Sequence, residues 1–251
     1  MSGAAEAFAI ASPALGEELR GYVVQPAGDP VALVYLLHGR GGAAEDWLPV
    51  LAGLTLPPLV AVLPDAPWSE RASWYVDSAA ADGKAVERAL VHDLVPALDA
   101  RFPALAGRSS RVLAGVSMGG AGALRIALAY PHLFGALISL SPAIYVPPPP
   151  PGSSLRMHGA FGRPDSRFNL PTYRALHYRR LLRNAPGLRA FVAVGDTDDL
   201  ADEAATVVSD LVGAGAQVES HRYPGGHGWE TWGPALGDGL RAVLSPSSAR
   251  A

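Results

Sequence analysis

Short apolar runs alternate with longer helix-compatible stretches along most of this 251-residue chain. The runs are bounded by Gly, Pro or Asp and several are rich in Val and Leu, which favours strands that are buried on both faces. The runs that stand out are 31–37, 59–63, 111–116, 136–140 and 190–194. Strands that alternate with helices are typical of a mainly parallel sheet covered by helices. The pattern therefore predicts an α/β fold.

Two further strands and four helices complete the expected frame. Residues 19–25 should add an antiparallel strand at the start, and residues 217–223 alternate enough to form a late strand near an edge. Helical spacing of apolar positions occurs in 83–101, 118–129, 200–213 and 231–244. We expect these helices to cover the two faces of the sheet.

The stretch 142–186 fits this alternation badly. It begins with a proline run at 147–151 and then mixes Arg, His, Tyr and Phe without a clear period. We interpret it as an irregular excursion over the active-site end of the sheet, and a plain surface loop with one short helix near 173–182 is the alternative. The length and the apolar fraction of 49% suit one core, so residues 1–251 are expected to form a single α/β domain.

Composition narrows the classes of function. The formal net charge is −3 and Lys and Arg form no cluster, which disfavours nucleic acid and anionic membrane surfaces as partners. The absence of cysteine excludes disulfides, thiolate metal sites and cysteine nucleophiles. Residues 1–10 have no basic segment and include Glu6, and the apolar runs are too short to span a bilayer. We therefore expect a cytoplasmic protein that uses no cofactor and no metal, in an oligomeric state that the sequence leaves open.

A serine between two glycines is the candidate nucleophile. Residues 115–119 read Gly-Val-Ser-Met-Gly and match the G-x-S-x-G motif, in which the serine lies on a sharp turn between a strand and a helix. Gly is needed at both flanking positions because backbones approach each other closely there. The strand expected at 111–116 precedes the motif and the helix expected at 118–129 follows it, which is the context that the motif requires. Ser117 is therefore predicted to be the nucleophile, with a structural turn serine as the alternative.

The candidate base is a histidine in a glycine-rich loop. In the fold that carries this motif, the α/β-hydrolase fold, the catalytic residues follow in the order Ser, acid, His. His227 comes directly after the strand expected at 217–223, in the run Gly-Gly-His-Gly. His221 lies within that strand and His177 lies in the excursion, so neither is well placed. His38 precedes the serine, and we expect it to have a scaffold role.

Three carboxylates follow the strand at 190–194, and one of them should orient the histidine. Asp198 occupies the last place of a G-x-x-D pattern, the position that commonly carries the acid in this fold. We therefore predict Asp198 as the acid, and Asp196 and Asp199 remain alternatives. Asp199 could instead cap the helix expected from residue 200.

These residues predict acyl transfer through a covalent intermediate. His227 would take the Ser117 proton so that the oxygen attacks an ester carbonyl, while Asp198 fixes the tautomer of the imidazole. The tetrahedral intermediate needs hydrogen-bond donors for its oxyanion. We expect one from the backbone N–H of Met118 and one from the backbone N–H of Arg40, in the loop His-Gly-Arg-Gly-Gly.

The motifs resemble those of the putative esterase family of α/β-hydrolases, which includes S-formylglutathione hydrolases, feruloyl esterases, enterochelin-type esterases and mycolyltransferases. The likeness is carried by 35–39 with the following glycines, by Gly-Val-Ser-Met-Gly-Gly at 115–120 and by Gly-Gly-His-Gly-Trp-Glu-Thr-Trp at 225–232. The segment Ser73-Trp74-Tyr75-Val76-Asp77 is similar to a site-lining stretch of that family. The resemblance implies that Trp47, Trp74 and Trp229 contact the substrate, although each could simply pack in the domain.

The resemblance implies a serine carboxylester hydrolase with a small-molecule ester as its partner. We expect short-chain or aryl esters as substrates, because no large lid is obvious in a chain of this size. Two alternatives stay open. One is an acyltransferase that uses the same site, and the other is a non-catalytic binding protein with the same fold.

Overall fold

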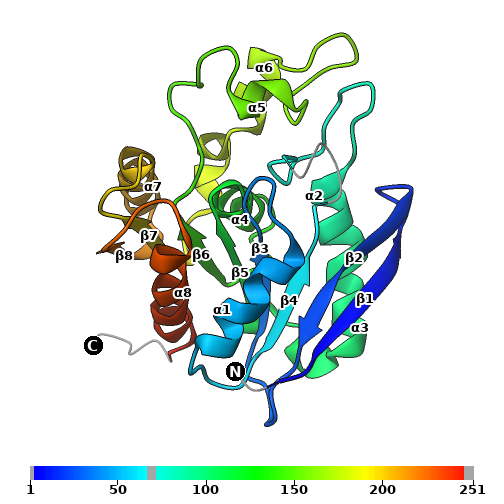
Figure 1. Cartoon of the computed structure of the whole chain (residues 1–251), viewed down its shortest axis with the longest axis vertical. Coiled ribbons are helices and arrows are strands. Elements are labelled where there is room, and N and C mark those ends of the chain that lie inside the picture. The colour runs from blue at the N-terminus through cyan, green and yellow to red at the C-terminus, as the bar shows by residue number, and fades with distance from the viewer. Residues whose placement is uncertain (1–2, 67–71, 246–251) are drawn as a thin grey trace.

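A computed structural model describes residues 3–66 and 72–245 of the chain, and within them eight strands form one sheet (Figure 1). The strands are β1 Ala5–Ser12, β2 Glu17–Val24, β3 Leu33–Leu37, β4 Val60–Pro64, β5 Arg111–Val116, β6 Ala136–Leu140, β7 Arg189–Gly195 and β8 Gln217–Tyr223. The helices are α1 Trp47–Gly53, α2 Val86–Arg88, α3 Val95–Arg101, α4 Met118–Ala129, α5 Ser154–Met157, α6 Leu170–Leu176, α7 Ala201–Gly213 and α8 Trp229–Leu244.

The strand order is β1-β2-β4-β3-β5-β6-β7-β8, and the six strands from β4 to β8 in this order run parallel. The first two strands are antiparallel, both to each other and where β2 meets β4. This is the sheet of the α/β-hydrolase fold. Parallel strands place their carboxyl ends at one edge, and the loops that follow β3, β5, β6, β7 and β8 therefore begin near one another.

Side chains of the parallel strands alternate between two cores. In β3, Leu33, Tyr35 and Leu37 pack on the face that α3, α4 and α7 cover, whereas Val34 and Leu36 pack on the face of α1 and α8. All five residues are buried, because helices cover both faces of a parallel sheet. This double burial explains why β3 is apolar throughout, and the helices lie on both faces of the sheet as expected.

The predicted elements agree closely with the observed ones, with two omissions. The expected segments at 111–116, 136–140, 217–223 and 118–129 are β5, β6, β8 and α4 with identical bounds. The sequence did not predict β1, which lies at the sheet edge and contains several alanines, a residue with low strand propensity. It pairs with β2 along all eight residues, and this pairing compensates for the weak local signal. The short helix α1 was also missed, because Pro49 lies in its first turn and obscures the period.

The helix predicted at 83–101 is less regular than expected. It consists of α2, a π-helical segment Ala89–Leu94 and α3 in direct succession. Pro96 lies in the first turn of α3 and lacks the N–H that a regular α-helix would direct at residue 92. The missing donor gives a physical reason for the wider turns before it.

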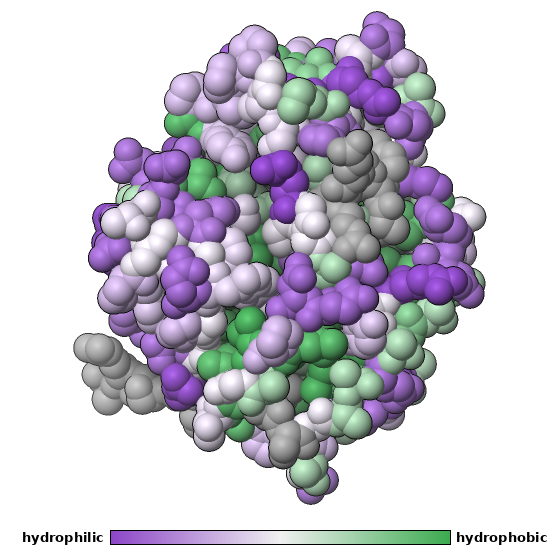
Figure 2. All heavy atoms as spheres, in the orientation of Figure 1, coloured by the Kyte–Doolittle hydropathy of each residue, from purple (hydrophilic) through white to green (hydrophobic). Residues whose placement is uncertain are grey.

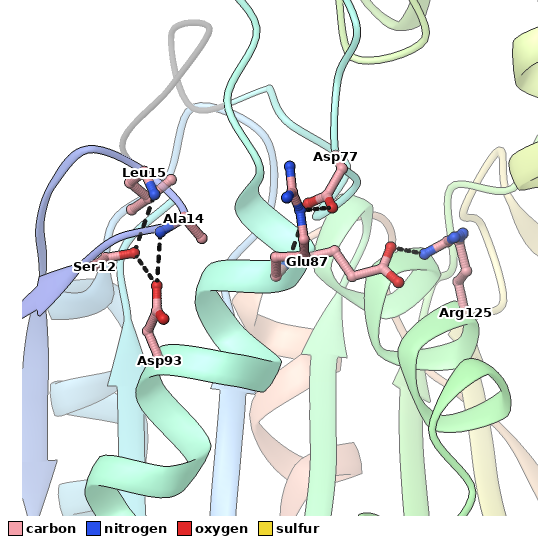
Figure 3. Close-up of polar contacts among 8 residues, drawn as sticks. Ser12, Ala14, Leu15, Asp77, Glu87, Asp93 and Arg125 are labelled. Atoms are coloured by element: carbon pink, nitrogen blue, oxygen red, sulfur yellow. Dashed lines mark hydrogen bonds and ion pairs between the residues drawn. The ribbon is translucent and has the colours of Figure 1, made fainter.

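The stretch 142–186 leaves the sheet after β6 and returns at β7, and Figure 1 shows its helices α5 and α6 at the top of the view. It is attached to the body by specific polar contacts. Arg125 of α4 donates from Nε to the carbonyl of Leu176, at 2.8 Å, and its guanidinium also pairs with the buried Glu87 (Figure 3). Tyr173 donates its hydroxyl to the carbonyl of Tyr145, at 2.7 Å. The segment is therefore an irregular region held to α4 and to its own first residues.

None of the helices in the described ranges combines the length and the apolar character that a membrane crossing would need.

Candidate active site

Ser117 lies on a tight turn between β5 and α4, as the motif predicts. Its backbone has φ 55° and ψ −117°, in the left-handed region that non-glycine residues rarely adopt. Three backbone hydrogen bonds hold it there. Its N–H donates to Leu140 in β6, and its carbonyl accepts from the N–H groups of Ala121 and Ala143. The surrounding structure thus supports a strained conformation that turns the hydroxyl outward from the sheet.

The flanking glycines allow this turn to close. A Cβ on Gly115 would lie 2.4 Å from the backbone of Gly119, and a Cβ on Gly119 would lie 2.2 Å from the carbonyl oxygen of Leu37 in β3. Both distances are far below van der Waals contact, and the obstructing atoms are backbone atoms. The spacing of the motif is therefore explained by close approach of β3, β5 and the start of α4.

The structure brings Ser117, His227 and Asp198 into one hydrogen-bonded chain. Nε2 of His227 lies 2.9 Å from Oγ of Ser117, and Nδ1 of His227 lies 3.1 and 2.9 Å from the two carboxylate oxygens of Asp198. An ionised carboxylate only accepts, so Nδ1 carries the imidazole proton and Nε2 is free to accept from the serine hydroxyl. The three groups come from the loops after β5, β7 and β8, at the carboxyl edge of the sheet.

Asp198 is buried at the base of this chain. Its residue is 5% exposed, and the N–H of Leu200 donates to its Oδ1 at 2.9 Å. Burial raises the pKa of the Asp198 carboxyl, but hydrogen bonds from the Ser141 hydroxyl, from Leu200 and from His227 outweigh it, so the pKa lies below its ordinary value. The group therefore remains a carboxylate at neutral pH.

The other two candidate acids are exposed. Asp196 accepts a hydrogen bond at 3.0 Å from the N–H of Gly225 and so supports the loop that carries His227. Asp199 precedes α7, whose N-terminal flanking residue is Leu200, and Leu200 donates to Asp198 rather than to Asp199. Of the three carboxylates, Asp198 is the one in contact with the imidazole.

The loop after β3 lies against the serine turn. The position of a Cβ on Gly39 is 3.5 Å from Cβ of Ser117, and the N–H of Gly42 closes a turn on the carbonyl of Gly39. This arrangement puts Arg40, between them, in the neighbourhood of the serine. Met118 is the first residue of α4, where backbone N–H groups have no partner within the helix. The two expected oxyanion donors, Arg40 and Met118, thus flank Ser117 from different elements.

His38 is a structural histidine in this loop. Its side chain is fully buried, Nε2 accepts from the N–H of Ala66 at 3.0 Å, and Nδ1 donates to the carbonyl of Gly39 at 2.7 Å. The hydroxyl of Tyr75 donates to the backbone carbonyl of His38 at 3.1 Å. Tyr75 lies in the segment 73–77, so this segment supports the loop after β3 from behind.

The three predicted tryptophans occupy different environments. Trp47 has no exposed surface and packs edge-to-face on Trp229, with ring centroids 4.9 Å apart, which favours the packing alternative for Trp47. Trp229 is partly exposed and lines a shallow, mostly apolar surface groove between α1 and α8, where Figure 2 shows hydrophobic residues gathered. Trp74 is buried, and its Nε1 donates to the carbonyl of Ala143 at 3.2 Å.

Trp74 also lines a small, partly open cavity beneath the excursion, with a volume of about 30 Å³. The cavity lies against the serine turn, since Ala121 and Ala143 line it and both donate to the carbonyl of Ser117. Its other walls are largely apolar and include Ile144, Leu155, Phe161, Tyr173 and Leu176. Bulky groups would fit only if the excursion moved.

Two residues at this site were not singled out from the sequence. Ser141 follows β6 and is fully buried, and its hydroxyl helps to lower the pKa of the Asp198 carboxyl. Trp232 donates from Nε1 to Oγ of Ser141 at 2.9 Å, and its ring packs edge-to-face on the His227 ring at 4.9 Å. Position could have indicated Ser141, because it follows a parallel strand whose neighbours carry the serine and the acid.

In the described ranges, no group of three or more His, Cys, Asp or Glu side chains is placed to hold a metal ion.

A mainly parallel sheet in this strand order, with a serine on a strained turn at its carboxyl edge, defines a carboxylesterase-type serine hydrolase of the α/β-hydrolase fold. The sequence comparisons identify the family. Residues 12–243 match the family described as "Putative esterase", and the chain belongs to that family.

Known proteins are similar to this chain along most of its length. An acetyl esterase of Caldicellulosiruptor saccharolyticus is 28% identical over 224 residues, which is 79% of this chain and 78% of that protein. A ferulic acid esterase structure superposes with a TM-score of 0.76 at 20% identity and covers 96% of this chain and 97% of its own. The fluorophosphonate-binding serine hydrolase F of Staphylococcus aureus has a TM-score of 0.76 at 17% identity and covers 97% and 99% of the two chains. At these identities the two structures establish the shared fold.

Proposed function

We propose that this esterase hydrolyses short-chain or aryl carboxylic esters through an acyl-enzyme on Ser117, with His227 as general base and acid and Asp198 as the residue that orients it. The observation that carries the proposal is the hydrogen-bonded chain from the Ser117 hydroxyl through His227 to the buried Asp198. In this chain each proton donor faces its acceptor before substrate arrives.

The reaction proceeds in two steps, acylation of Ser117 and hydrolysis of the acyl-enzyme. Nε2 of His227 takes the proton of Ser117 as Oγ bonds to the ester carbonyl carbon, and the imidazolium then gives this proton to the leaving alcohol as the C–O bond breaks. A water molecule next loses a proton to Nε2 and attacks the acyl carbon, and the same proton returns to Oγ of Ser117. Asp198 stays ionised throughout and stabilises the imidazolium.

The backbone N–H groups of Arg40 and Met118 are proposed to stabilise the oxyanion of each tetrahedral intermediate. The proposal rests on the contact of the loop after β3 with the serine turn and on the free N–H groups at the start of α4. Removal of one such donor typically lowers kcat by about 10²–10³-fold. Their backbone origin means that side-chain substitutions at 40 and 118 leave the donors in place.

The substrate range follows from the small apolar cavity beside Ser117 and from the family relative. Trp74 remains a candidate for contact with the acyl group, because it lines the cavity next to the serine turn. Trp229 remains a candidate for contact with the alcohol portion, because it is partly exposed two residues after His227. The small volume of this cavity favours a short acyl group, in keeping with the similarity to an acetyl esterase.

Ser117→Ala tests the mechanism. With 4-nitrophenyl acetate and butyrate as substrates, the variant should lose at least about 10³-fold in kcat, because the nucleophile is removed. It should also lose covalent labelling by a fluorophosphonate probe while keeping the thermal stability of the wild type. Turnover or labelling that survives in Ser117→Ala would contradict the proposed mechanism. An added alcohol that diverts most of the acyl group from water would instead indicate acyl transfer.

A further inference from the structure

The buried end of the catalytic chain continues beyond the carboxylate. Trp232 lies in the first turn of α8, and its Nε1 donates to Oγ of Ser141, at 2.9 Å. The Ser141 hydroxyl in turn is close enough to the Asp198 carboxylate to help lower the pKa of that carboxyl. Ser141 is fully buried and Trp232 is 8% exposed, so water does not compete for these groups.

The chemistry of these groups allows one direction for the hydrogen bonds. The indole N–H can only donate, so Oγ of Ser141 must accept from it, and the single hydroxyl proton is left for the carboxylate, which can only accept. A donor that itself accepts a hydrogen bond is polarised and donates more strongly. The chain of polar groups therefore runs from Trp232 through Ser141, Asp198 and His227 to Ser117.

The backbone at Ser141 supports this arrangement. Its φ is 46°, in the left-handed region, and its N–H donates to the carbonyl of Ala193 in β7 at 2.8 Å. A residue with a side chain rarely adopts this conformation, and Gly would do so without strain. A polar side chain is nevertheless present, at the one place where it reaches the carboxylate between β6 and β7.

We infer that Ser141 and Trp232 are positioning residues for the esterase reaction, which hold the Asp198 carboxylate in the orientation that directs His227 at Ser117. Trp232 acts twice, through its N–H on Ser141 and through its ring, which packs on the His227 ring at 4.9 Å. This inference rests on the proposed function, because it assigns a second layer of residues to the same three side chains.

Among the described residues, two titratable side chains interact with this carboxylate. His227 contacts it directly, and Tyr145, from the segment after β6, is close enough for Asp198 to affect its pKa. Burial raises the pKa of Tyr145, the charge of Arg40 opposes this, and Glu203 on α7 adds to it. A change in the acid limb of the pH–rate profile in variants of Ser141 can therefore be attributed to the His227–Asp198 pair.

The test compares Ser141→Ala and Trp232→Phe with the control Ser12→Ala. Ser12 is also a buried serine that donates to a carboxylate, that of Asp93, but it lies at the β1 edge of the sheet (Figure 3), far in strand order from β7. Trp232→Phe keeps a ring against His227 and removes the N–H. For each variant kcat, KM and kcat/KM are measured against pH with 4-nitrophenyl acetate, together with the melting temperature.

Ser141→Ala should lower kcat by about tenfold with KM within about twofold, as expected for loss of a charge-assisted hydrogen bond. The acid limb of the pH–rate profile should move to higher pH, because an Asp198 carboxylate without this donor stabilises the imidazolium of His227 more strongly. Trp232→Phe should shift the limb in the same direction by less. Ser12→Ala should lower the melting temperature and leave kcat, KM and the acid limb unchanged.

Trp232→Phe is compared with Ser12→Ala in two quantities, kcat per folded molecule and the acid limb of the pH–rate profile, and so is Ser141→Ala where it folds. The inference is overturned if these variants match Ser12→Ala in both quantities. Failure of the proposed function gives a different result, since Ser117→Ala would then keep its turnover. If Ser141→Ala does not fold, Trp232→Phe decides by itself.

Discussion

Two histidines that each precede a glycine lie at the same edge of the sheet, one in the loop after β3 and one in the loop after β8. The ring of His38 is fully buried and bonds to two backbone groups, the N–H of Ala66 and the carbonyl of Gly39. The ring of His227 is partly exposed and bonds to two side chains, the hydroxyl of Ser117 and the carboxylate of Asp198.

The partners, rather than the adjacent glycines, separate the two roles. A backbone N–H and a carbonyl do not exchange protons at neutral pH, so they fix the position and tautomer of His38. A hydroxyl on one side and a carboxylate on the other allow His227 to gain a proton and be stabilised when charged. In the proposed mechanism both loops serve the same reaction, one by shaping the site and the other by moving the proton.

Removal of the imidazole at 227 gives the largest expected effect. His227→Ala should lower kcat by about 10³–10⁴-fold, because Ser117 loses its general base. The unfolding free energy should change little, since the ring is partly exposed. Steady-state kinetics with 4-nitrophenyl acetate and urea unfolding measure the two quantities. A variant with less than a tenfold loss in kcat would show that the comparison assigns the roles wrongly.

The same substitution in the other loop should mainly change stability. His38→Ala leaves the N–H of Ala66 without its side-chain partner and removes one of two hydrogen bonds to the carbonyl of Gly39, at a cost of about 1–3 kcal/mol. The expected kcat of the folded protein stays within about tenfold of wild type, because the chain of Ser117, His227 and Asp198 is intact. Urea unfolding measures the loss in the free energy of unfolding. Active-site titration gives the concentration of folded enzyme, by which kcat is corrected. A loss as large as that of His227→Ala would contradict a scaffold role.

The smallest effect is on acid stability, and it sharpens the comparison because the imidazole of His227 contacts a carboxylate, that of Asp198. The pKa of Asp198 is depressed in the folded protein, so its ionisation stabilises the fold above the ordinary carboxyl pKa of about 4, and this contribution is lost as pH falls through the lower folded value. The stability difference between wild type and Asp198→Asn should therefore shrink as pH drops from about 5. Asp199→Asn, at an exposed neighbour, should show no such convergence in unfolding experiments at several pH values.

Much of this architecture could be predicted from the sequence because the parallel strands are buried on both faces. Runs such as 111–116 carry no polar interruption and are bounded by loop residues, so β5 and β6 were predicted to the residue. The edge strand β1 lacks this signal. Its stability comes from pairing with β2, a contact between chain segments that periodicity within one segment does not report.

The same distinction, between local sequence signals and contacts formed only on folding, explains which residues of the site the sequence could indicate. Ser117 and His227 lie in local motifs whose glycines have a local physical reason, so spacing was sufficient to propose them as site residues. The choice of Asp198 over Asp196 and Asp199 depended on a pattern, and the geometry agrees with it through burial and contact with His227. Ser141 and Trp232 belong to no shared motif, since 91 residues separate them, and only folding brings them together.

The left-handed backbone at residue 117 also bears on how this enzyme could be improved. A conformation that disfavours every residue with a side chain is retained here for the hydroxyl that it presents, and Gly would occupy it at lower energy. Selection for heat resistance alone would therefore tend to replace the serine and yield a more durable but inert protein. Screens for robust variants of this fold need turnover as a second criterion.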